Sequence, residues 1–387
     1  PSRDSCLQCP IGTYSTVNGS TSLANCEPCP AGTYSIHLGA YALWFCVECP
    51  AGKFSPLLGA TSDDACEDCI AGTYSSAPGA TSNITCVNCP AGTYSLDPAA
   101  PDISFCLWCP QGKYSSTPGA PNIDYCLQCP PGTYSFEWAA PSEASCRECW
   151  AGSYSSGSGA TSNATCQNCP LGTYSMTSRA SGIEYCLNCP MGKYSDMPGA
   201  YSWTYCHACP AGKYAIESRA ISLLYCLECV AGTYSDVPGA NSSSYCLACP
   251  PGTFSTSPGA SSFTDCQWCP QGTYSTTGGG SSPNVCQDCE KGKYSYEWGA
   301  PSSQSCLSCW PGTWSSTPRA TSNATCQFCP RGKYSTTNGA YSIDDCLNCP
   351  LGKFSTEEAA PDDSVCDECP WGKYSNEPGI QSLDACL

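Results

Sequence analysis

The cysteines of this chain lie on a strict 20-residue grid, and no other feature limits the possible fold as strongly. Among the 39 cysteines of the 387 residues, twenty stand at Cys6 and every twentieth position to Cys386, and nineteen at Cys9 and every twentieth position to Cys369. A content of about 10% cysteine indicates a disulfide scaffold or a metal array. Because no stretch longer than one unit lacks a cysteine pair, a single large hydrophobic core is excluded.

The grid reflects a continuous array over residues 1–387 of about nineteen repeats, with units 9–28, 29–48 and so on to 369–387. In every unit a glycine stands three residues after the second cysteine of the C-x2-C motif, as Gly12 does after Cys9, and an aromatic residue stands two positions later, as at Tyr14. A 160-residue super-repeat is superimposed, because 135–142 recurs as 295–302. The chain begins inside a repeat, so we expect it to be a fragment of a longer chain.

Each unit is predicted to be a small hairpin. The sequence Gly-Thr-Tyr-Ser is typical of a short strand, and Pro-Gly, as at Pro78-Gly79, suits the two central positions of a type II turn. Arg179, Arg219 and Arg319 replace that glycine, so we expect that a positive φ is not required there. The aromatic residue is expected to pack on a disulfide and on the ring of the next unit. Helix is not expected.

The predicted fold class is therefore small disulfide-rich β, with tandem 20-residue hairpin-like units stacked into an elongated solenoid-like rod.

The cysteines have two possible roles. The spacing C-x2-C-x16-C-x2-C matches a zinc ribbon, but each C-x2-C motif could serve only one zinc, so paired units should alternate every 40 residues, and they do not. Disulfides are favoured, and three regular pairings are possible. Pairing within C-x2-C closes a tiny ring that constrains little chain, and pairing Cys6–Cys26 with Cys9–Cys29 again needs the missing 40-residue alternation. The third pairing uses each cysteine at most once in a uniform 20-residue unit. It pairs Cys9–Cys26, Cys29–Cys46, Cys49–Cys66, Cys69–Cys86, Cys89–Cys106 and so on to Cys369–Cys386. It leaves Cys6, whose partner we expect in a preceding unit.

The motif also resembles a known family. Cys29-Pro30-Ala31-Gly32-Thr33-Tyr34-Ser35, followed by Gly39-Ala40 and Cys46-x2-Cys49, is similar to the ephrin-receptor-like cysteine-rich repeat and to the first submodule of tumour necrosis factor receptor cysteine-rich domains. The resemblance extends over essentially the whole chain. It implies that the cysteine before Pro-x-Gly pairs with the next cysteine along, which is the pairing given above. This chain lacks the second, different submodule of the receptors.

Charge and glycosylation motifs bear on location and partners. With 15 Lys and Arg against 32 Asp and Glu, the net charge of −17 disfavours nucleic acid and anionic membrane surfaces. No apolar window is long enough for a membrane span in this fragment. Dense disulfides and N-x-Ser/Thr motifs predict an extracellular or cell-surface protein with N-linked glycans. The five motifs begin at Asn18, Asn83, Asn163, Asn241 and Asn323. O-linked glycans are expected at 115–118 and 315–318.

A further pattern predicts packing between chains. If the residues around the first cysteine of each C-x2-C motif form a strand, one face is apolar in some units and carries the glycosylation motif in others. Both sets recur at steps of 80 residues, which predicts one adhesive side and one glycosylated side. The expected lateral contacts are Phe105, Tyr125, Tyr185, Trp203, Tyr205 and Tyr225.

No catalytic arrangement is apparent, because no histidine repeats with the serine at Ser15 and its equivalents. The chain is not expected to be an enzyme or to need a cofactor or metal. We expect a structural component of an extracellular glycosylated filament or cell-surface stalk, stabilised by one disulfide per repeat and assembled with itself or with other filament chains. The alternative is an adhesion or receptor ectodomain spacer that presents a distal ligand-binding region.

Overall fold

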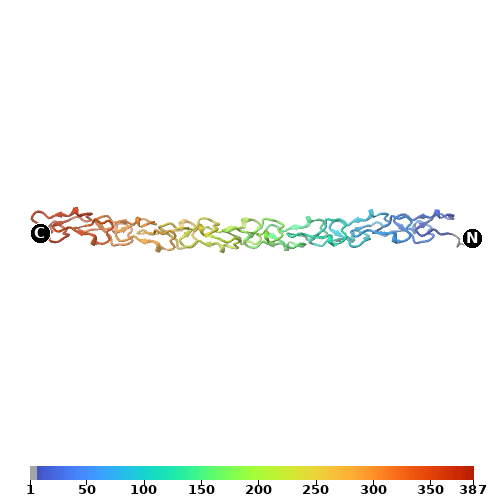
Figure 1. Ribbon diagram of the computed structural model, residues 1–387, viewed down its shortest axis with the longest axis horizontal. Helices are drawn as coiled ribbons and strands as arrows, with labels where there is room; N and C mark the ends of the chain where they lie inside the picture. Colours follow the sequence, from blue (N-terminus) through green and yellow to red (C-terminus); the bar gives the residue numbers. More distant parts are fainter. Residues whose placement is uncertain (1–6) are drawn as a thin grey trace. The chain divides into compact units, whose positions relative to one another are not determined.

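The computed structural model describes residues 7–387 and consists of the same small motif repeated every 20 residues (Figure 1). Each repeat from 9–28 to 349–368 contributes a two-residue strand, a one-turn 3-10 helix and a second two-residue strand, whereas repeat 369–387 contributes only the 3-10 helix. The first strands run from β1 (Thr13–Tyr14) at 20-residue steps to β35 (Lys353–Phe354), and the second strands run from β2 (Glu27–Pro28) to β36 (Asp367–Glu368). The 3-10 helices run from η2 (Leu23–Asn25) to η20 (Leu383–Ala385). The predicted tandem hairpin fold is confirmed.

The two strands of a repeat pair antiparallel, with Thr13 opposite Pro28 and Tyr14 opposite Glu27. The second strand therefore begins directly after the first cysteine of each C-x2-C motif. Between the strands, the amide of Cys26 donates to the carbonyl of Leu23 and closes the 3-10 turn. Helix was not expected from the even spread of glycine and proline, so these short turns correct the prediction. One turn needs so few residues that neighbouring breakers do not prevent it.

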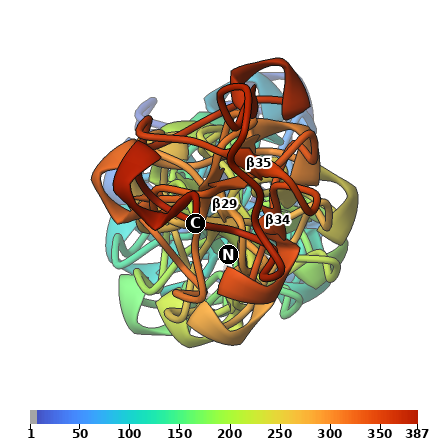
Figure 2. The same ribbon diagram turned by 90° about the vertical axis from the view of Figure 1, so that its left-hand side faces the viewer.

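The chain divides into two compact units, each a series of repeats. Unit 1 comprises Pro1–Leu187 and Met197–Tyr205, and unit 2 comprises Asn188–Asp196 and Cys206–Leu387. Within each unit the repeats follow one another in sequence order, as the colours of Figure 1 indicate. In Figure 2 the labelled strands of unit 2, β29 (Lys293–Tyr294), β34 (Leu347–Asn348) and β35, lie toward the middle of the view, and the short helical turns lie toward its outside.

Main-chain hydrogen bonds join each repeat to the next. Tyr14 forms a parallel bridge with Ala40, and the same bridge recurs at 20-residue steps to Phe354 and Ile380. Around it, the amide of Ser15 donates to the carbonyl of Ala40 at 3.0 Å, and the amide of Gly12 donates to the carbonyl of Ser35 at 2.8 Å. Because these bonds use only backbone atoms, the side chains of a repeat can vary without changing how repeats join.

Small side chains fill the interior. Cys29, Ser35 and Ala40 are at most 3% exposed, and their equivalents are buried in most repeats. The repeated aromatic residue is only half-buried in most repeats, as at Tyr34, and Phe254 is the exception at 7% exposure. The expected packing on a disulfide is seen at Tyr194, which packs against the buried Cys209 and Cys226. The ring contacts within residues 7–387 include none between the repeated aromatic residues of neighbouring repeats, so the expected packing of one ring on the next is wrong.

The turn before the buried alanine has a positive φ in every repeat. Thirteen glycines have this conformation, and so do Ala99, Ala139, Arg179, Arg219, Arg319 and Ala359, with φ between 55° and 65°. The three arginines had suggested that a positive φ is not required, and this interpretation is wrong. The turn is fixed by the amide of this residue, which donates to the carbonyl of a cysteine in the preceding repeat, as Arg179 does to Cys149 at 2.9 Å.

Candidate structural site: the disulfide-closed repeat

One disulfide closes each repeat. Cys9 pairs with Cys26, and the same bond recurs at 20-residue steps to Cys369 and Cys386, always across 17 residues. The Cα atoms of the pairs lie 5.5–5.9 Å apart. This is the pairing that the family resemblance implied, and it leaves no thiolate for zinc in these repeats. Cys6 lies outside the described residues.

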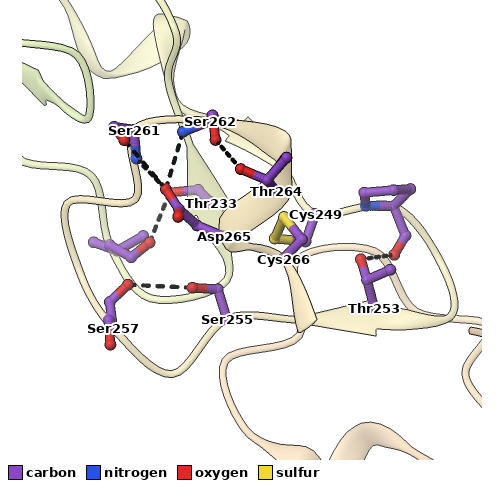
Figure 3. The surroundings of a disulfide bond; sticks show 12 residues. Thr233, Cys249, Thr253, Ser255, Ser257, Ser261, Ser262, Thr264, Asp265 and Cys266 are labelled. Atoms are coloured by element: carbon purple, nitrogen blue, oxygen red, sulfur yellow. Dashed lines mark hydrogen bonds between the residues drawn. A yellow bond between two sulfur atoms is a disulfide. The ribbon is translucent and has the colours of Figure 1, made fainter. Parts of the chain in front are cut away.

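Short polar contacts surround each disulfide, as Figure 3 shows for Cys249 and Cys266. On one side, the hydroxyl of Thr253 donates to the carbonyl of Pro250 at 2.7 Å. On the other, the carboxylate of Asp265 accepts from the amide of Ser261 at 2.7 Å and from the amide of Ser262 at 3.1 Å. These amide hydrogen bonds lower the pKa of Asp265, with the bond from Ser261 contributing most. The disulfide is thus held between a capped strand and a capped turn.

The glycine after the second cysteine is needed for two reasons. Gly12 has a φ of 80°, and a Cβ placed on it would collide with the carbonyl of Gly59, two repeats further along. The sequence predicted a tight turn or an approach to a disulfide. The structure places the close approach at the backbone of another repeat. The glycine therefore sets the spacing between a repeat and the second repeat after it. No signal within a single repeat could have revealed this contact.

The repeated serine is structural. Ser195 is fully buried, and its amide donates to the carbonyl of Ala220 at 3.0 Å, whereas its hydroxyl has no hydrogen-bond partner. Ala215 occupies the equivalent position, 1% exposed, and makes the same backbone bond to Ala240. The expected bonding of this hydroxyl to the local backbone occurs in some repeats, as at Ser375, which donates to Glu377 at 2.6 Å. Small size, rather than the hydroxyl, is common to all repeats.

The predicted glycosylation residues are all exposed. Asn83 begins η5 (Asn83–Thr85), and Asn163 and Asn323 begin the equivalent turns η9 (Asn163–Thr165) and η17 (Asn323–Thr325). Asn241 stands two residues before η13 (Ser243–Tyr245), and Asn18 lies at the loop tip between β1 and η2. Ser115 and Ser315, which were expected to carry O-linked glycans, are buried, so the prediction is wrong for these two residues. The two residues that follow each of them are exposed.

The predicted lateral contacts lie on 3-10 turns. Phe105 ends η6 (Ile103–Phe105), and Trp203 and Tyr205 belong to η11 (Trp203–Tyr205). The period of two that placed these residues on a strand face is therefore wrong, because a turn separates the residues differently. Phe105, Tyr125, Tyr185, Trp203 and Tyr225 are 38–55% exposed, and Tyr205 is half-buried against Tyr201, with ring centroids 4.8 Å apart.

Metal binding and membrane insertion were the two remaining possibilities for the described part of the chain. Residues 7–387 contain no group of three or more His, Cys, Asp or Glu side chains placed to hold a metal ion. No helix within the same range is long and apolar enough to span a membrane.

Part of the chain is similar to a known family. The family model described as tyrosine-protein kinase ephrin type A/B receptor-like matches residues 2–44, 158–206 and 221–266. These three segments carry the same hairpin, disulfide and positive-φ turn as the repeats between them. A comparison with curated proteins found no significant match.

Proposed function

We propose that this chain, an array of ephrin-receptor-like cysteine-rich repeats, is a structural segment of an extracellular glycosylated filament or cell-surface stalk. The coarser conclusion, an extracellular structural or receptor-like region, follows from the repeat family and the disulfides. The finer one rests mainly on a single observation. The same disulfide closes each repeat, and the same backbone hydrogen bonds join it to the next, so the chain extends by addition of equivalent units.

Two other features support a mechanical role. Each disulfide closes its hairpin covalently, which is worth about 3 kcal/mol for a loop of this length. Each repeat also bonds to its neighbour through three or more backbone groups that no surface substitution removes, such as the amide of Gly39 to the carbonyl of Cys9 at 2.9 Å. A segment built in this way resists extension without relying on a large apolar core.

Electron microscopy of the purified native protein, without added ligand, tests the proposal. Fibres of uniform width are expected, and treatment with a reducing agent should disperse them. Single chains alone, at every protein concentration tested, would contradict the filament proposal. Single chains with a distinct bound partner at one end would favour the receptor or adhesion spacer instead.

A further inference from the structure

Two pairs of exposed tryptophans stand out from the repeats. Trp108 and Trp138 are 64% and 55% exposed, and Trp268 and Trp298 are 56% and 58% exposed. The second pair follows the first by 160 residues, the length of the super-repeat. Large apolar side chains exposed to this extent on a small-residue framework commonly mark a contact surface.

The fold brings the two members of each pair together, although 30 residues separate them. In other repeats the residues at the same two positions touch: the hydroxyl of Ser158 bonds to Gln128 at 2.5 Å, and that of Ser178 bonds to Glu148 at 2.8 Å. For the second pair, a Cβ placed on Gly299 would lie 2.5 Å from Cε3 of Trp268, so this indole lies on the backbone beside Trp298. The two positions of each pair therefore lie side by side on the surface, and we call the two indoles together an aromatic platform.

A glutamine bond fixes the loop that carries the second tryptophan. The side-chain amide of Gln111 donates to the carbonyl of Phe136 at 2.8 Å, and that of Gln271 donates to the carbonyl of Tyr296 at 2.7 Å. In both copies of the super-repeat, this glutamine therefore binds the backbone two residues before the second tryptophan of the pair, Trp138 or Trp298. Ring contacts within residues 7–387 include no stacking of Trp108 on Trp138 or of Trp268 on Trp298, so the indole faces are not covered by each other.

We propose that these two tryptophan pairs are carbohydrate-binding platforms, and that their ligands are pyranose rings of neutral N-glycans on a second copy of this chain. The C–H groups of a pyranose ring carry partial positive charge and suit the negative face of an indole. The bare surface of a second copy is a poorer partner, because two chains of charge −17 repel each other. Glycans extend beyond the protein surface and carry no such charge.

The glycosylation motifs have the spacing that the proposal needs. Each copy of the 160-residue super-repeat holds one tryptophan pair and a motif on a 3-10 turn 25 residues after the second tryptophan, at Asn163 and at Asn323. Because the tryptophan pairs and these two motifs recur with the same 160-residue period, two adjacent chains in one register could place a glycan on each tryptophan pair. This step rests on the proposed glycosylated filament.

The first experiment uses the intact chain and a free high-mannose oligosaccharide as the probe, with saturation-transfer NMR as the readout. We expect transfer to fall by about half in Trp108→Leu/Trp138→Leu and in Trp268→Leu/Trp298→Leu, and to vanish in the quadruple variant. Leucine keeps an apolar side chain without a flat ring. The matched control is Trp150→Leu/Trp310→Leu, which removes two other exposed tryptophans separated by 160 residues, 51% and 44% exposed. Equal transfer in the control and the quadruple variant overturns the proposal.

The second experiment identifies the source of the glycan. Sedimentation of the native protein should show association that is lost after enzymatic removal of N-glycans and also in the quadruple variant. Association that survives deglycosylation but requires the tryptophans would mean a protein–protein contact, and would overturn the proposal. Because binding of the free oligosaccharide does not depend on fibre formation, its failure is distinguishable from failure of the proposed filament role.

Discussion

At the scale of single residues, the positive-φ position shows how the repeat tolerates substitutions that its backbone disfavours. All nineteen copies have the left-handed conformation, and six of them are alanine or arginine. A Cβ in this region costs about 1 kcal/mol relative to glycine. For Arg179 and Arg319, ion pairs with Glu143 and Asp288 accompany the substitution. These pairs are exposed, so they contribute little.

Exchanging glycine and alanine at this position should change local stability in opposite directions. We expect Ala99→Gly to stabilise its repeat by up to about 1 kcal/mol and Gly239→Ala to destabilise its repeat by about 1 kcal/mol. An added Cβ at Gly239 would lie 3.5 Å from Ala208, so strain in φ, rather than a collision, is the expected cause. Amide hydrogen exchange of the two repeats measures both changes. A destabilising Ala99→Gly would contradict this account.

The buried serine offers a second test, with a natural precedent at Ala215. Because the hydroxyl of Ser195 is buried without a partner, Ser195→Ala should be neutral or stabilising by about 1 kcal/mol. Ser195→Leu should instead disrupt the contact with the next repeat, since the site is fully buried against backbone. Thermal unfolding of the two variants gives the comparison. A clear loss of stability in Ser195→Ala would show that the hydroxyl has a role that its contacts do not reveal.

The sequence predicted some of these residue roles and missed others. Cysteine spacing and the invariant glycine were sufficient for the hairpin and for the disulfide, because both are local to one repeat. The burial of Ala40 and its bridge to Tyr14 were not predicted, since contacts between repeats have no local signal. The positive φ at Arg179 was missed because a sequence displays the substitution but not the backbone bond to Cys149 that enforces the turn.

At the scale of elements, the disulfide-closed hairpin is the stable part and the strands alone are not. Two residues per strand are too few for an isolated hairpin to persist in water. Removing one bridge by Cys249→Ala/Cys266→Ala should cost about 3 kcal/mol in that repeat. Hydrogen exchange should show lost protection at the amide of Cys269, which donates to the carbonyl of Gly252. Unchanged protection would mean that contacts between repeats suffice. Cys209→Ala/Cys226→Ala removes the equivalent bridge of another repeat and should have the same effect there.

The caps of the 3-10 turns predict a pH response. Asp102 accepts from the hydroxyl and the amide of Ser104, and these bonds, the hydroxyl first, lower its pKa. A depressed pKa means that the cap contributes stability above the unfolded pKa, about 3.9, and loses it as pH falls through the lower folded value. The amide resonance of Ser104 should therefore titrate below the usual Asp midpoint.

Asp102→Asn is the control for this titration. Asn122 caps the next turn through an equivalent bond to the amide of Asp124, at 2.9 Å, without a titrating group in the cap. The variant should keep the turn and abolish the titration of Ser104. A midpoint for the native protein at or above the ordinary value for aspartate would contradict the capping account.

At the scale of the whole molecule, stability is distributed over many small, nearly equal interfaces. Each repeat bonds to the next through the backbone and approaches the repeat after that at its invariant glycine. A structure of this kind behaves as a one-dimensional series of coupled units rather than as one cooperative core. Unfolding should consequently depart from a two-state transition, with a van't Hoff enthalpy below the calorimetric enthalpy.

Gly112→Ala tests how far a local defect spreads. The new Cβ would collide with the carbonyl of Gly159, two repeats further along, and would occupy a backbone with φ of 76°. We expect amide protection to fall in the repeats that contain Gly112 and Gly159 and in the repeat between them, because the collision pushes apart two repeats that lie on either side of a third. Repeats of unit 2, such as the one around Cys309, should keep native protection, since the backbone bonds and close approaches described above join repeats that are one or two steps apart. Gly19→Ala, where an added Cβ meets no neighbour, serves as the control for the change of residue type. Loss of protection throughout residues 7–387 would indicate a single cooperative unit and would contradict the series of independent interfaces.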